Sequence, residues 1–253
     1  MKTFTTDFAI GVASYFKAIQ LIRRKRMAYL FIFPILICTA LAIAAFVMRS
    51  EIIEWISGNL DTWVNFEGWP EWVQGIGKGF LHVVLFVVTW YLFYRFQKYL
   101  VLILLSPVLA YASEKTEEAL TGKKYPFNLF QFLKDTFRGI MIAIRNLVLE
   151  TLCSGLLLLI ALVPIFAPFT LILGLLVGWY FLGYSMVDYH NERQQLSIRS
   201  GNQLIRKRKG LVIANGMVFE FIFVIPLLGF IVAPILSAMA ATVAMEETKI
   251  YKS

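Results

Sequence analysis

The sequence predicts an all-α integral membrane protein with two long transmembrane helices, two short proline-centred membrane hairpins and amphipathic interfacial helices. The first observation is composition, because 59% of the 253 residues are hydrophobic and only 16% are charged. That is too little charge to cover a soluble globule of this length. The mean hydropathy of +0.71 agrees. The second observation is that several apolar stretches are long enough to cross a bilayer. The third is that two of them are interrupted by prolines.

The first interrupted stretch covers residues 148–187, where Glu150 is the only charge and Pro164 and Pro168 mark the apex. Forty helical residues extend about 60 Å at roughly 1.5 Å each. Two crossings of a hydrocarbon core about 30 Å thick use all of that length and leave none for a turn. The apex also has no polar residue to meet water. We therefore expect a hairpin that turns within the membrane, with an ordinary spanning hairpin as the alternative.

The second interrupted stretch, residues 211–245, repeats this design, with Glu220 as its only charge and Pro226 near its apex. Its length of about 52 Å is too short to cross twice. Prolines at depth are tolerated where protein or water satisfies the freed backbone groups. Paired interrupted apolar segments of this kind indicate a substrate site in transporters.

Charge is segregated along the chain. Residues 49–78 hold five acids and only two bases, together with four tryptophans typical of an interfacial belt. The other polar segments are rich in lysine and arginine: residues 1–26 hold six such bases, residues 95–145 eight, and residues 188–209 six. The positive-inside rule then predicts that both termini are cytoplasmic and that residues 49–78 lie outside.

These patterns divide a single membrane domain into eight segments. They are an amphipathic and basic segment (1–26), a transmembrane helix (27–48), an extracytoplasmic loop (49–78), a long transmembrane helix (79–122), an amphipathic helix (127–146), the first hairpin (147–189), a basic cytoplasmic segment (190–210) and the second hairpin (211–245). Both amphipathic helices carry an apolar stripe that we expect to lie in the membrane interface. The stripes are Phe8, Val12, Tyr15, Ile19 and Ile22 in one, and Phe130, Leu133, Phe137, Ile140 and Ile144 in the other.

Several classes of protein are disfavoured. In a membrane protein, the net charge of +8 indicates contact with anionic lipid rather than with nucleic acid. No motif of a hydrolase or nucleotide-binding enzyme is present, so we expect neither catalysis nor a cofactor. Cys38 and Cys153 lie in apolar runs without metal or disulfide spacing. His82 and His190 are too few and too far apart in sequence to predict a metal site.

Two sets of charged residues are candidates for a binding site. Arg23, Arg24 and Arg26 are the densest guanidinium cluster, and guanidinium groups bind oxyanions in a bidentate way. The alternative is that the cluster only determines topology.

The second set is expected to line a polar passage and comprises Arg95, Lys98, Glu150 and Glu220. Buried acids there would pair with Arg95, Lys98 or Arg145. The alternatives are that the two acids stabilise helix N-termini and that the two bases reach out to lipid headgroups.

Several short motifs follow one another over nearly the whole chain. They are Ser106-Pro107, Ser113 to Glu117, Leu120-Thr121-Gly122, Lys134-Asp135 with Arg138, Pro164, Trp179 with Asp188-Tyr189, and Ile225 to Leu228 with Ala233-Pro234. Together with the order of elements, they resemble the CysZ/EI24 family. Bacterial members of the family are described as sulfate permeases or channels, and the resemblance implies two long helices plus two membrane-penetrating hairpins. Sulfate-binding members carry a Gly-Leu/Ile-Arg motif before the first spanning helix. Arg26-Met27-Ala28-Tyr29 stands there instead.

The sequence therefore predicts a channel or permease for a small inorganic anion, with sulfate as the candidate, in the inner membrane of a bacterium. We expect it to be a homo-oligomer in contact with membrane lipids. The alternative is a membrane scaffold that transports nothing and binds lipid or protein partners through its amphipathic helices and basic loops.

Overall fold

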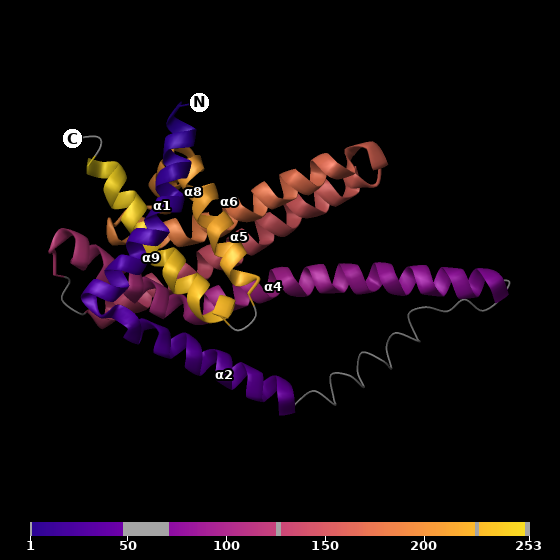
Figure 1. The fold of residues 1–253 in the computed structure, drawn as a ribbon, viewed down its shortest axis with the longest axis horizontal. Coiled ribbons are helices and arrows are strands. Elements are labelled where there is room, and N and C mark those ends of the chain that lie inside the picture. The colour runs from indigo at the N-terminus through magenta and orange to yellow at the C-terminus, as the bar shows by residue number, and fades with distance from the viewer. Residues whose placement is uncertain (1, 48–70, 125–127, 226–227, 251–253) are drawn as a thin grey trace. The chain divides into compact units, whose positions relative to one another are not determined.

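A computed structural model describes residues 2–47, 71–124, 128–225 and 228–250, and these residues form helices and turns with no strand. The elements are α1 (Lys2–Lys25), η1 (Met27–Phe31), α2 (Ile32–Val47), α4 (Glu71–Thr121), α5 (Leu129–Ala161), η2 (Pro164–Phe166), α6 (Ala167–Arg193), α7 (Ile198–Lys207), α8 (Lys209–Phe223) and α9 (Leu228–Ile250) (Figure 1). Four described helical stretches are long and apolar enough to cross a membrane. The predicted all-α membrane fold is confirmed.

The chain forms two units, which are described separately. The first comprises Met1–Ile35 and Tyr99–Ser253, and the second Leu36–Lys98. The core of the first unit lies where α1, α6, α8 and α9 pack together, with α5 alongside α6. A polar contact lies inside this core: the Tyr15 hydroxyl is 2.7 Å from the Asn215 carbonyl oxygen and 2.8 Å from Ser237 Oγ. Burial raises the pKa of Tyr15 because the phenolate would lose its hydration.

Glycines bring α6 and α8 into backbone contact. A Cβ atom at Gly183 would lie 1.9 Å from the Val212 carbonyl oxygen, and one at Gly216 would lie 1.8 Å from the Trp179 carbonyl oxygen. Neither position has room for a methyl group. Lipid tails are as apolar as leucine, so helices in a membrane associate through close packing at small residues. This crossing fixes the two hairpins against each other within the first unit.

The buried face of α1 is formed by small and polar residues. Asp7, Gly11, Ser14 and Ala18 are buried together with Tyr15. Ile19 of the expected apolar stripe is exposed, and Phe8, Val12 and Ile22 are only partly covered. The reason is that α1 packs closely on α8, where a Cβ at Gly11 would lie 2.7 Å from that of Ala214. A larger side chain at Gly11 would not fit in this contact.

Helix α5 is longer than the sequence segments suggested. The amphipathic segment 127–146 and the first arm of the hairpin form one helix, because no proline or other strong helix breaker separates them. Phe130, Leu133, Phe137 and Ile144 of its apolar stripe are exposed. The opposite, buried face instead holds Asp135, Gly139, Ile142, Ala143, Asn146, Glu150 and Ser154. This arrangement suits a helix whose apolar face contacts lipid.

The other boundaries also differ from the expected segments. The chain at 27–48 starts with a 3-10 turn, η1, before α2, and Pro34 lies in the first turn of α2, where a missing N–H is tolerated. Helix α4 begins at Glu71, within the segment expected to be a loop. Residues 48–70, which include most of that predicted extracytoplasmic loop, lie outside the described residues.

The apex of the first hairpin satisfies much of its own backbone. Leu162 N–H donates to Leu159 O at 3.3 Å, Val163 N–H to Ile160 O at 3.2 Å, and Phe166 N–H to Val163 O at 2.9 Å. Prolines have no N–H to leave unpaired. The surrounding large apolar side chains are exposed, among them Leu156, Leu159, Leu162, Ile165, Phe169 and Ile172. Such an apex is suited to hydrocarbon, where unpaired polar groups are costly.

The second hairpin has a similar design. Val224 N–H donates to Glu220 O at 3.1 Å, and Gly229 N–H donates to Ile225 O at 2.7 Å. Phe221, Val224, Ile225 and Leu228 are exposed and apolar. Pro226 and Leu227 of the predicted apex lie outside the described residues.

We predict that the first hairpin stops short of the far membrane surface. The apolar stretch of residues 148–187 is 40 residues long. That is about 60 Å of helix, and two crossings of a hydrocarbon core of about 30 Å would use all of it and leave no residue for the turn. In a variant with Cys38 and Cys153 replaced by alanine, a cysteine at Phe166 should resist an impermeant maleimide added from outside. A cysteine at Asn59, in the predicted outer loop, is the positive control. Labelling of Phe166→Cys as fast as the control would mean that the hairpin spans.

Candidate functional site

The two acids predicted to line a passage lie together in the structure. Glu150 is 1% exposed on α5, and Glu220 is half-buried on α8. A Cβ atom at Gly178 of α6 would lie 3.3 Å from Glu150 Oε1 and 3.8 Å from Glu220 Oε2. Both carboxylates therefore reach the same point on α6. Tyr99, itself fully buried, donates its hydroxyl hydrogen to Glu150 Oε2.

The alternative role for these acids, at helix N-termini, is excluded. Glu150 lies in the second half of α5, and Glu220 lies one turn from the end of α8. Neither helix has an acid in its first turn. The expectation failed because α5 begins at Leu129, well before the apolar stretch, and because α8 ends at Phe223, shortly after Glu220. These carboxylates are buried by neighbouring helices instead.

The predicted guanidinium cluster lies at the end of α1. Arg23 and Arg24 lie in the last turn of α1, and Arg26 follows with a left-handed backbone at φ 54°. All three side chains are exposed. Cations at a helix C-terminus interact favourably with the helix dipole. The position suits an anion contact and a topology determinant equally.

The remaining two candidates belong to the second unit. Lys98 is 2% exposed, so it does not reach out to headgroups as the alternative interpretation supposed. The side chain of Arg95 lies outside the described residues. Arg145, expected as a possible partner for the acids, instead lies 4.4 Å from the Tyr184 ring centroid and donates from Nη2 to Asn146 Oδ1 at 2.9 Å.

A second polar cluster lies at the C-terminal end of α6. Arg138 binds Asp188 with two parallel bonds, Nε to Oδ2 and Nη2 to Oδ1, each 3.0 Å, and its Nη1 donates to Leu196 O at 2.6 Å. Arg193 Nη1 lies 2.7 Å from Glu114 Oε2 and 3.6 Å from Asp135 Oδ2. These pairs tie α4, α5 and α6 together.

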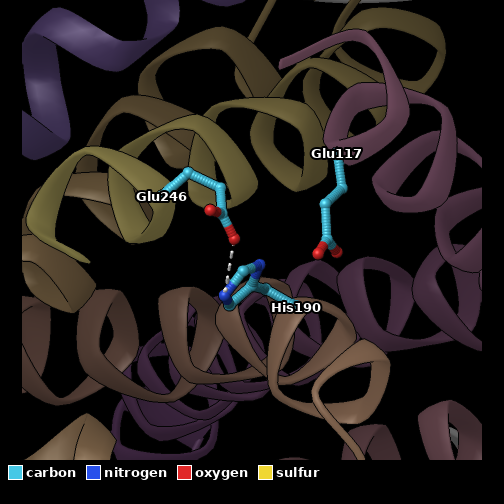
Figure 2. Close-up of side chains that lie close together, drawn as sticks. All are labelled: Glu117, His190 and Glu246. Carbon is cyan, nitrogen blue, oxygen red and sulfur yellow. Dashed lines mark ion pairs between the residues drawn. The ribbon is translucent and has the colours of Figure 1, made fainter. Parts of the chain in front are cut away.

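Three side chains from different helices also lie close together at this end of α6 (Figure 2). They are Glu117 of α4, His190 of α6 and Glu246 of α9. His190 Nε2 lies 3.5 Å from Glu246 Oε1. One ligand-type atom from each residue lies within 4.8 Å of the other two. The two histidines alone predicted no metal site, because the carboxylates that lie near His190 come from helices distant in sequence.

Sequence reasoning missed this end of α6 because it resembles a loop. Residues 188–193 are all polar and were divided between a hairpin end and a cytoplasmic segment. In the structure they continue the helix, and Asp188, His190, Asn191 and Glu192 are buried. One signal in the sequence was available: no helix breaker separates these polar residues from the apolar helix before them. That absence indicates that the helix continues through them.

A comparison with protein families found that residues 14–234 match the family described as sulfate transporter CysZ/etoposide-induced protein 2.4. No match was found among curated proteins.

Proposed function

The chain belongs to the CysZ/EI24 family, and we propose that it transports a small inorganic anion, with sulfate as the first candidate. The family match, which covers most of the chain, is the observation that carries this proposal. No covalent chemistry is involved. Basic side chains attract the oxyanion, and the two hairpins supply the walls of the pathway.

The arrangement of polar groups supports transport over a scaffold. A lipid-binding or protein-binding scaffold needs its polar residues near the headgroups and loops. Here Glu150 and Glu220 converge on Gly178 between apolar helices, while the lipid-facing arms of the first hairpin are almost wholly apolar. Buried ionisable groups in a membrane protein are costly, and they usually mark pathways.

In this proposal the two acids do not bind sulfate. Two carboxylates close together would repel a dianion in a medium of low dielectric constant. Their role is to hold hydroxyl donors such as Tyr99 in place along the pathway. Arg95 and Lys98 stay candidate pathway residues because of their positions in the sequence.

We propose that Arg23, Arg24 and Arg26 capture the anion at the membrane surface. The protein would act as a homo-oligomer in a bacterial inner membrane with both termini in the cytoplasm. The charge bias of the loops supports this orientation. Arg26-Met27-Ala28-Tyr29 stands where family members that bind sulfate carry their glycine and arginine motif, so these three arginines replace that motif in the proposal.

Replacing both Arg23 and Arg24 with glutamine tests this assignment. Each charge-assisted hydrogen bond lost is expected to weaken sulfate binding on the order of tenfold. Arg→Lys at both positions should restore only part of the affinity, because an ammonium keeps the charge but loses the planar fork. The measurements are sulfate binding to purified protein and flux into liposomes.

The matched control replaces Lys207 and Lys209 with glutamine. Both lysines are exposed, and the change in net charge is the same. If the two double variants behave alike, bulk electrostatics explains the effect, and the arginines only determine topology.

A further inference from the structure

We propose that Glu117, His190 and Glu246 form a binding site for a divalent transition-metal ion, with Zn²⁺ as the best fit. Imidazole nitrogen and carboxylate oxygen both bind zinc, and a site with three protein ligands leaves one position for water. The site joins α4, α6 and α9. It is independent of the transport proposal.

One spacing in the cluster matches that between two ligands of a metal ion, and the three ligand atoms all lie within 4.8 Å of one another. His190 Nε2 and Glu246 Oε1 are 3.5 Å apart, longer than a normal charge-assisted bond. Two ligands of a tetrahedral zinc ion, with bonds of about 2.0–2.1 Å, are roughly 3.3–3.4 Å apart. Figure 2 shows the carboxylate of Glu246 directed at the imidazole of His190 and the carboxylate of Glu117 to one side of the ring.

Burial of the three side chains favours the binding of a cation. Glu117 is 1% exposed and His190 is fully buried, while the Glu246 side chain is 14% exposed. Removing two carboxylates from water is costly unless their charge is compensated. A divalent cation would interact with both carboxylates more strongly in this buried position than in water.

Contacts around the site hold the ligands in position. Gln194 Nε2 donates to Glu117 Oε1 at 2.8 Å, which is the kind of outer contact that orients a metal-binding carboxylate. One helical turn before the two glutamates, Ser113 Oγ and Thr242 Oγ1 are 2.9 Å apart and fix α4 against α9. The Tyr189 hydroxyl donates to Ser106 Oγ at 3.3 Å and ties α6 to α4.

The test uses the full chain purified in detergent, without an affinity tag and stripped of metal by a chelator. We expect one Zn²⁺ per chain in a competition titration with a chromophoric chelator. Glu117→Gln and Glu246→Gln should each weaken binding tenfold or more. The controls are their sequence neighbours, Glu118→Gln and Glu247→Gln. These two acids pair with Lys115 and Lys17, and their loss should leave zinc affinity unchanged.

A second measurement needs no variant. Co²⁺ added to the stripped parent protein should give the visible absorption of a four-coordinate site, and Zn²⁺ should raise its unfolding temperature. The proposal is overturned if the parent protein binds no stoichiometric metal. It is also overturned if the ligand variants and the neighbour variants bind alike. In either case, a protonated His190 paired with carboxylates would explain the cluster.

Discussion

Gly216→Ala is expected to prevent stable packing of α8 on α6. The added methyl group would lie 1.8 Å from the Trp179 carbonyl oxygen and 2.9 Å from the Gly183 amide nitrogen. Both contacts are with backbone, so no side chain can rotate away and the helices must separate. Ordinary overpacking costs about 1–3 kcal/mol, and here we expect a loss of at least about 3 kcal/mol. Gly183→Ala should have the same effect, because it faces the Val212 carbonyl oxygen.

The measurement is the temperature at which the detergent-purified protein stops eluting as a single species. Gly155→Ala and Gly174→Ala are the matched controls, since nothing lies within 4 Å of a Cβ atom at either position. Both controls should keep the parent's stability. Equal behaviour of Gly216→Ala and Gly174→Ala would show that α6 and α8 do not cross as closely as described.

Arg138→Gln should be the most damaging change at the polar end of α6. Arg138 and Arg193 lie among four carboxylates, those of Glu114, Asp135, Asp188 and Glu192. Removing one partner of a buried ion pair costs about 3–5 kcal/mol. Loss of Arg138 also increases repulsion among the remaining acids. Asp188→Asn should cost less, because it removes one carboxylate from an acid-rich cluster.

Thermal stability of the purified variants checks the order of these two effects. Lys134→Gln, one helical turn from Arg138 and exposed, is the control for loss of a positive charge on α5. A larger loss for Asp188→Asn than for Arg138→Gln would contradict the electrostatic account of this cluster.

Periodicity and length predicted the helices well, because hydrophobic stretches in a membrane protein are long and nearly free of charge. They predicted the breaks between helices less well. Helix α5 runs through the expected boundary at residue 146, since polarity changes there but backbone preference does not. The backbone contact between α6 and α8 was not predictable. It depends on two glycines that pack together although they are far apart in sequence.

The candidate site was predictable residue by residue but not as an arrangement. Glu150 and Glu220 stand out as single charges in apolar stretches. They meet at Gly178 because α6 lies between α5 and α8. This packing order of the helices cannot be read from the sequence. The cluster of Glu117, His190 and Glu246 was missed for the same reason. It gathers one residue from each of three helices.

Sulfate flux into liposomes tests the central claim most directly. Purified protein is reconstituted, labelled sulfate is added outside, and uptake is compared with that of protein-free liposomes. The account predicts protein-dependent uptake, competition by excess unlabelled sulfate, and slower uptake by the Arg23→Gln, Arg24→Gln double variant than by the Lys207→Gln, Lys209→Gln control. Adding chloride or phosphate as a competitor shows which other anions the protein accepts. Uptake equal to that of empty liposomes, from protein that remains folded, would contradict transport and favour a membrane scaffold.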